Sequence, residues 1–150
     1  MTDYYELRIE VPGHIGMRSV VDRGARPPIV SSLHFVFDGW GGDEILTSFP
    51  VFLVTESLAA TFSERGFTGA EMGSVEVEKS RQISVLQPLC ELPKFLWLKV
   101  TGDHKDADFF ITRNQHLGVS PRALAAILET NPQTLRYRLY DEGTSSREWN

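Results

Sequence analysis

The chain has 150 residues, a hydrophobic content of 41%, one cysteine and a formal net charge of −5 at pH 7. This length fits a single domain spanning 1–150, with enough apolar residues for a core. The lone Cys90 excludes an internal disulfide and a multi-cysteine zinc site. The apolar runs are far shorter than the roughly 18 residues of a membrane helix, and the charged start is not typical of a signal peptide. We therefore expect a cytoplasmic protein that does not contact a membrane.

The excess of acidic over basic residues lies entirely in residues 1–75, whereas residues 76–150 are balanced. An acidic balance argues against nucleic-acid binding and favours a basic partner. Simple solubility is the alternative reading of the same charge.

The first third of the chain predicts two strands separated by a loop. Strict alternation of apolar and polar residues predicts a half-buried strand over 4–11. Residues 14–28 are rich in Gly, Pro and Arg, so we expect an irregular loop there. Residues 33–37 are predicted as the second strand.

The central stretch, 38–66, contains the clearest local signals of the chain. A glycine-rich turn, 38–44, is followed by an apolar extended run over 45–54. Thr55 can cap a helix with its hydroxyl, because the first N–H groups of a helix have no partner within it. Gly66 suits the left-handed position just past the helix end.

Further strands are predicted over 74–78, 95–100, 109–112 and 117–119. Ser120 followed by Pro121 then marks a second helix start, since proline loses nothing at the first helical position. Asn131 and Pro132 stop that helix, and Leu135, Tyr137 and Leu139 alternate like a strand. Residues 141–150 are predicted as a frayed tail.

Together these elements predict an α+β fold, with a mostly antiparallel sheet and two short helices packed on one face. Strand–helix–strand occurs twice, over 51–78 and 117–140. The helix starts are similar, V-T-E-S-L-A-A against V-S-P-R-A-L-A-A, so an internal repeat and shared helix-start chemistry are both open.

Residues 119–139 support a second interpretation, a helix-turn-helix that binds DNA. Residues 133–140 would then be a recognition helix carrying Gln133, Arg136 and Arg138. The same residues alternate equally well as a strand, and the chain is acidic, which makes nucleic acid an unfavourable partner.

The turn 38–44 is the candidate binding site, because acids, an aromatic residue and flexible backbone converge there. Tryptophan is a frequent interface anchor, and nearby acids steer a basic partner toward it. The partner-binding residues we predict are Asp38, Trp40, Asp43 and Glu44. The alternative is that Trp40 packs in the core while the aspartates hold the turn through backbone N–H groups.

We expect neither an enzyme nor a metal or cofactor site. The acids near residue 40, and those at 103–108, lack the ligand spacing of a calcium loop or zinc site. The histidines His14, His34, His104 and His116 do not pair at metal-binding spacing, and His34 is expected to face the surface of its strand. No nucleophile elbow, phosphate loop or dinucleotide fingerprint is present, so catalytic and cofactor-binding residues are predicted to be none.

Blocks of residues spread over 38–128 carry a family resemblance. They are Trp40-Gly41-Gly42-Asp43-Glu44, 46–56, 66–69, 92–95, 97–100, 108–109, 119–120 and 122–124. In these blocks the chain resembles small, poorly characterised immunity proteins of bacterial polymorphic toxin systems.

This resemblance implies a non-enzymatic protein that binds a cognate toxin domain in the producing cell and blocks its active site. An acidic inhibitor suits a basic toxin such as a nuclease, because matched charge speeds their encounter. The resemblance supplies no catalytic residue.

Overall fold

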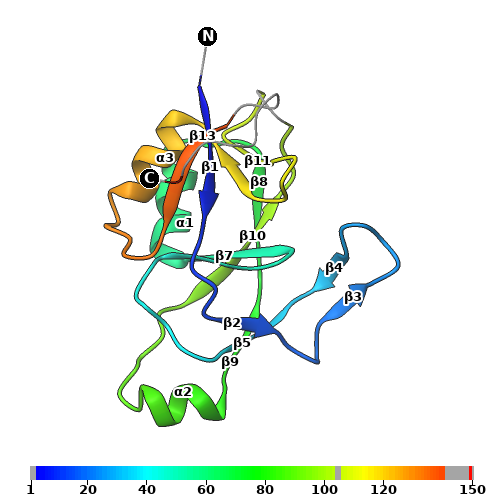
Figure 1. The fold of residues 1–150 in the computed structure, drawn as a ribbon, viewed down its shortest axis with the longest axis vertical. Helices are drawn as coiled ribbons and strands as arrows, with labels where there is room; N and C mark the ends of the chain where they lie inside the picture. The colour runs from blue at the N-terminus through cyan, green and yellow to red at the C-terminus, as the bar shows by residue number, and fades with distance from the viewer. Residues whose placement is uncertain (1–2, 104–105, 141–148, 150) are drawn as a thin grey trace.

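The computed structural model describes residues 3–103, 106–140 and 149, which form four β-sheets and three short α-helices (Figure 1). All but one of the strand pairs in this part of the chain are antiparallel, and the helices are short, so the predicted α+β class is confirmed. The third helix is an addition to the two that the sequence predicts.

Two four-stranded antiparallel sheets form the upper part of the molecule. The β1 sheet has the order β11 (Phe109–Ile111), β12 (Leu117–Val119), β1 (Tyr4–Arg8), β13 (Arg136–Tyr140). The β7 sheet has the order β6 (Ile45–Ser48), β7 (Val51–Thr55), β10 (Phe95–Val100), β8 (Ala70–Gly73).

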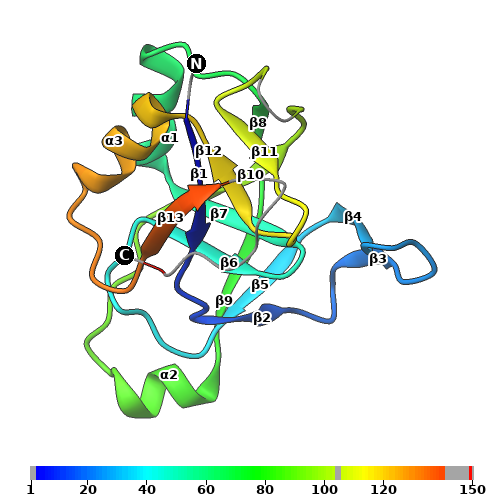
Figure 2. The ribbon, with the colours of Figure 1, turned by 45° about the horizontal axis from the view of Figure 1, so that its top comes forward.

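The helices α1 (Glu56–Glu64) and α3 (Pro121–Leu128) begin where the sequence predicts and lie side by side (Figures 1 and 2). The Thr55 hydroxyl accepts a hydrogen bond from the Leu58 N–H, and the Ser120 hydroxyl accepts one from the Ala123 N–H. The apolar sides of both helices join residues of the two large sheets in one core, to which Phe62 contributes. Burying such a side chain stabilises the fold by roughly 1.5–3 kcal/mol.

A smaller sheet and a two-stranded arm complete the fold. The β5 sheet has the order β2 (Gly13–Ile15), β5 (His34–Phe37), β9 (Glu76–Lys79), and β5 and β9 run parallel. The arm consists of β3 (Val20–Asp22) and β4 (Ile29–Ser32), and it projects from the body in both views (Figures 1 and 2). The predicted loop over 14–28 is therefore wrong in part, because it contains β3 and most of β2.

The short helix α2 (Arg81–Leu86) lies at the opposite end of the molecule from α1 and α3 (Figure 1). It buries one residue, Ile83, in a second core formed with β5 and with β10. Ser80 caps α2 through its hydroxyl, although the sequence reasoning did not predict this helix.

The two predicted strand–helix–strand units have the same topology. Each repeat is a hairpin, a helix and a further strand: β6-β7-α1-β8 in the first repeat and β11-β12-α3-β13 in the second. In each sheet one more strand lies between the last two strands of the repeat. That strand is β10 in the first sheet and β1 in the second. β10 directly precedes the second repeat in sequence, whereas β1 is followed by β2 to β5 before the first repeat begins. The last strand of the first repeat is β8, not the predicted 74–78.

The repeats also match at individual positions. The same sequence offset separates Thr55 from Ser120, which cap the helices, and Gly66 from Asn131, which both have positive φ past the helix end. This offset also relates Thr68 to Gln133. Thr68 N–H donates to Asp108 Oδ2 at 2.8 Å, and Gln133 N–H donates to Asp43 Oδ1 at 2.7 Å. These reciprocal bonds tie the loop after each helix to the start of the other repeat's hairpin.

Strand β13 rules out the predicted recognition helix. Residues Arg136–Tyr140 pair with β1 along its length, with Glu6 opposite Arg138. The alternation of Leu135, Tyr137 and Leu139 therefore reflects an extended segment that ends in a half-buried strand. A helix-turn-helix over 119–139 is wrong, because only its first helix exists.

None of the helices in the described part of the chain is long and apolar enough to span a membrane.

Candidate functional site

The glycine-rich turn around Trp40 is fixed by hydrogen bonds on several sides. Trp40 N–H donates to Gln87 Oε1 at 2.8 Å, and Gln87 Nε2 donates back to the Trp40 carbonyl at 3.0 Å. The indole Nε1 donates to the Asp43 carbonyl at 2.9 Å, and the ring meets Phe95 edge-on. Trp40 therefore packs partly against the second core and is only half-buried.

Asp43 lies in the interior, with 2% of its surface exposed. Its carboxylate accepts hydrogen bonds from the N–H groups of the segment before β13. The donors are Gln133 at 2.7 Å, Thr134 at 3.0 Å and Leu135 at 3.2 Å. The structure thus does not place Asp43 on a surface patch, and this residue matches the alternative in which an aspartate holds the turn.

Asp38 and Glu44 are half-buried, but they lie at different places. Asp38 Oδ2 is 2.8 Å from His14 Nδ1. Burial alone would raise the pKa of Asp38, but hydrogen bonds from Ser80 and His14 outweigh it and lower the pKa. Glu44 Oε1 instead accepts a hydrogen bond from Thr55 Oγ1 at 2.6 Å, at the start of α1.

Trp40 and Glu44 share a surface pocket of about 420 Å³, which we call the Glu44 pocket. Thr55, Glu56 and Ser57 of the first helical turn form one wall, and Lys94 lies at the rim. Lys94 Nζ is 3.2 Å from Glu56 Oε2, and both side chains are mostly exposed. Of the four predicted partner-binding residues, the structure brings these two together and leaves out Asp38 and Asp43.

Glu10 belongs to the turn but was not predicted, because it lies far from it in sequence. Its Oε2 accepts a hydrogen bond from the Gly41 N–H at 2.6 Å, and its Oε1 is buried with no hydrogen-bond partner. Burial, followed by repulsion from Asp43, raises the pKa of Glu10 despite its backbone hydrogen bonds. Glu10, like Asp43, therefore helps to hold the turn.

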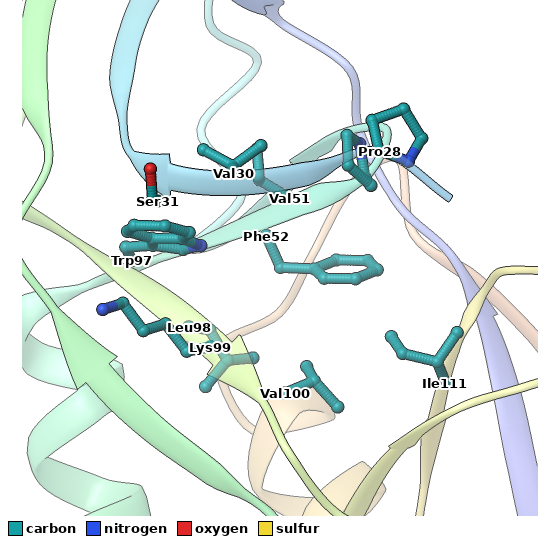
Figure 3. Close-up of a pocket in the computed structure, with 11 residues that line it drawn as sticks. Pro28, Val30, Ser31, Val51, Phe52, Trp97, Leu98, Lys99, Val100 and Ile111 are labelled. Atoms are coloured by element: carbon teal, nitrogen blue, oxygen red, sulfur yellow. The ribbon is translucent and has the colours of Figure 1, made fainter. Parts of the chain in front are cut away.

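An apolar groove of about 470 Å³ lies between the arm and β10 (Figure 3). Phe52 lies in its middle, between Val30 of β4 and Ile111 of β11. Lys99 is its only charged lining residue, and the Lys99 ammonium lies 4.6 Å from the centre of the Trp97 ring. The groove can hold apolar side chains, and it offers no acid–base pair for chemistry.

A second hollow of about 350 Å³ adjoins the groove, and Phe52 lines both. The turn between β6 and β7 separates them, with Pro50 facing the groove and Phe49 the second hollow. Phe49 is 55% exposed. Two other large apolar side chains that line the hollows are also exposed, Val11 and Ile111. Sequence patterns did not reveal this face, because its residues come from strands and turns that are far apart in the chain, from β1 to β12.

Two polar clusters lie elsewhere. Contrary to the sequence expectation, His34 is buried. Its Nδ1 accepts a hydrogen bond from the Arg18 N–H at 3.2 Å, and its Nε2 is 2.9 Å from Glu78 Oε1 and 3.0 Å from Arg18 Nη2. Arg18 also pairs with Glu76 and Glu78.

The second polar cluster centres on Asp108, whose carboxylate is almost fully buried. Arg122 holds it with two hydrogen bonds, from Nε at 2.8 Å and Nη2 at 2.7 Å. Burial would raise the pKa of Asp108, but the bonds from Arg122, Ser120 and Thr68 together hold the pKa well below its usual range. In the described residues, no three His, Cys, Asp or Glu side chains are placed to hold a metal ion.

No family model matches the sequence, and no curated protein matches it either. The function must therefore be argued from the geometry of this chain.

Proposed function

We propose that this protein is a non-enzymatic binding protein of the immunity type, which docks on a cognate bacterial toxin domain and neutralises it. The observation that carries the proposal is the apolar face formed by the groove, the second hollow and the exposed side chains around them. Exposed apolar surface of this kind is typical of protein-interaction sites, because burying it releases water from apolar groups. The proposed site of action is the cytoplasm of the producing cell.

The shape of this face favours a protein partner over a small molecule. The groove is open, and Val30 of the projecting arm forms part of one of its walls. Protein interfaces combine an apolar centre with a polar rim, and aromatic side chains are common anchors. Phe49, at the boundary of the two hollows, is the anchor we propose.

The net charge of −5 suits a basic partner. Charge of opposite sign increases the rate of encounter, whereas the apolar contacts hold the complex together. Toxins that act on nucleic acids need basic surfaces, and they are the class of partner that we propose.

The experiment uses the full chain as bait in its native bacterium, with quantitative mass spectrometry of the captured proteins. Phe49→Glu places a charge at the centre of the apolar face, at a side chain that is already exposed. Val85→Glu is the matched control, because Val85 is 70% exposed on α2, away from the groove.

We expect one stoichiometric partner that Phe49→Glu loses and Val85→Glu retains. Expressed alone, this partner should stop growth, and co-expression of the wild-type chain should restore it. A partner that both variants retain equally would refute the assignment of the face, and a captured protein that is harmless alone would refute neutralisation.

A further inference from the structure

The two repeats place an acid and a hydroxyl at equivalent helix starts. In the first repeat, Glu44 precedes β6, and its carbonyl accepts a hydrogen bond from the Thr55 N–H at 2.9 Å. In the second repeat, Asp108 precedes β11, and its carbonyl accepts the same bond from Ser120 at the same distance. Each capping hydroxyl also donates to the carboxylate, at 2.6 Å and 2.5 Å. Glu44 and Asp108 are thus equivalent in their bonds to the capping residue, whereas Asp43 is the equivalent of Asp108 by sequence offset and by its bond from the loop after the other helix.

In the second repeat a guanidinium group lies beside the carboxylate. Arg122, two residues after the cap, binds both oxygens of Asp108 and lies 5.0 Å over the ring of Phe67. Asp108, Ser120 and Arg122 also line an open hollow of about 380 Å³. Planar, two-pronged pairing is the arrangement in which arginine binds carboxylates most strongly.

In the first repeat the equivalent of Arg122 is Ser57, whose side chain is too short to reach Glu44. Within the described structure, Glu44 accepts a side-chain hydrogen bond only from Thr55. The ammonium of Lys94 is paired with Glu56 instead. The Glu44 pocket therefore keeps the acid, the hydroxyl and an aromatic residue, Trp40, but its chain supplies no guanidinium.

We propose that the Glu44 pocket binds an arginine side chain of a partner protein, in the place that Arg122 fills in the second repeat. Two carboxylates, Glu44 and Glu56, face one ammonium, Lys94, so the pocket retains a net negative charge. Trp40 offers an aromatic surface, as Phe67 does for Arg122. This site is separate from the apolar groove, so the proposal does not depend on the function proposed for the groove.

The test measures binding of capped amino acids to the full chain by NMR, following the indole N–H resonance of Trp40. The probe is N-acetyl-arginine amide, and the matched control is N-acetyl-citrulline amide, which has the same shape without the charge. Free arginine is a further arm, which distinguishes a small-molecule site from a side-chain site.

Two substitutions complete the design. Glu44→Gln keeps the size of the side chain and removes its charge. Ser57→Arg, at an exposed position, introduces the residue that the second repeat carries. We expect it to fill the pocket, abolish binding of the arginine probe and raise Tm by roughly 2–4 °C. Glu64→Gln, at the other end of α1, is the control for loss of one negative charge.

The expected result is a Trp40 shift with the arginine probe that citrulline does not produce. Glu44→Gln should weaken this binding by about three- to fivefold, as for an exposed ion pair, and Glu64→Gln should leave it unchanged. Equal shifts with arginine and citrulline, or equal binding by wild type and Glu44→Gln, would overturn the proposal. Tighter binding of free arginine than of the capped form would assign the pocket to a small molecule and overturn the protein-partner assignment. If Glu44→Gln fails to fold, unchanged binding in Ser57→Arg overturns the proposal by itself.

Discussion

Replacing Asp43 with alanine tests the role that the structure assigns to the glycine-rich turn. The buried carboxylate accepts three backbone hydrogen bonds from the segment before β13, and Leu135 in that segment is itself buried. A hydrogen bond to a charged group contributes roughly 1.5–3 kcal/mol, and a buried donor left unpaired costs about 1–3 kcal/mol. Because the three bonds share one acceptor they are not additive, so we expect Asp43→Ala to lower the free energy of unfolding by about 3–5 kcal/mol.

That loss is a large part of the roughly 5–15 kcal/mol that stabilises a typical domain. Asp43→Asn keeps one acceptor oxygen and should lose about half as much. Asp38→Ala is the matched control from the same turn. Because the Asp38 side chain is 32% exposed and pairs with a histidine, its loss should change the free energy of unfolding by less than about 1 kcal/mol.

Urea unfolding at pH 7, followed by far-UV circular dichroism, measures all three variants. If Asp43→Ala and Asp38→Ala have the same midpoint, Asp43 does not hold β13 in place, and the structural account of the turn is wrong. If Asp43→Ala alone loses stability, amide hydrogen exchange should locate the loss at 133–135.

The remaining predictions concern three other groups. Asp108 has a lowered pKa in the folded protein. Its contribution to the free energy of unfolding is therefore complete above its unfolded pKa of about 3.9 and is lost as the pH falls below that value. Asp108→Asn should flatten the decline of the urea midpoint between about pH 4 and 2. Glu10 has a raised pKa in the folded protein, so stability is lost as the pH rises through this raised pKa and the buried carboxyl ionises. Glu10→Gln should therefore raise the free energy of unfolding at pH 7 by up to about 1 kcal/mol. An equal gain at pH 4 would show that ionisation of Glu10 is not the cause. A methyl group at Gly69, which has a φ of 94°, would lie 2.2 Å from the Phe109 carbonyl oxygen, whereas one at Gly42, with a φ of 100°, meets nothing within 4 Å. By thermal unfolding, Gly42→Ala should therefore cost about 1 kcal/mol and Gly69→Ala clearly more, and equal costs would exclude the close contact as the cause.

Local signals in the sequence predict the elements that are formed locally. The caps Thr55 and Ser120 and the stop at Gly66 place α1 and α3, because these side chains and backbone angles act within one helical turn. Alternation likewise predicts β10, and it favours a strand over 136–140 as much as a helix. The loop predicted at 14–28 is wrong in part, because β3 lies within it, while Gly24, Pro27 and Pro28 lie only in the connection between β3 and β4.

Contacts between distant residues explain what the sequence could not predict. Asp43 and its partners at 133–135 are far apart in the chain, so no local pattern distinguishes an acid that holds the turn from one that faces a partner. Trp40 and Glu44 line one surface pocket, since both are close in sequence, and their binding of a partner stays a prediction. It misses the apolar groove, because that lining is assembled from β4, β7, β10 and β11.

The two repeats use their acids differently at the start of each hairpin. In the second repeat, Asp108 alone accepts the bond from Thr68, the bond from the capping hydroxyl and the guanidinium of Arg122. In the first repeat these tasks are divided: Asp43 accepts the bond from Gln133, and Glu44 accepts the bond from the capping hydroxyl. Because Asp43 alone ties the first hairpin to the other repeat, Glu44 is not needed for that contact. Its charge can therefore serve binding at little cost to the fold, which is why Glu44→Gln should weaken a ligand while Asp43→Ala weakens the whole domain.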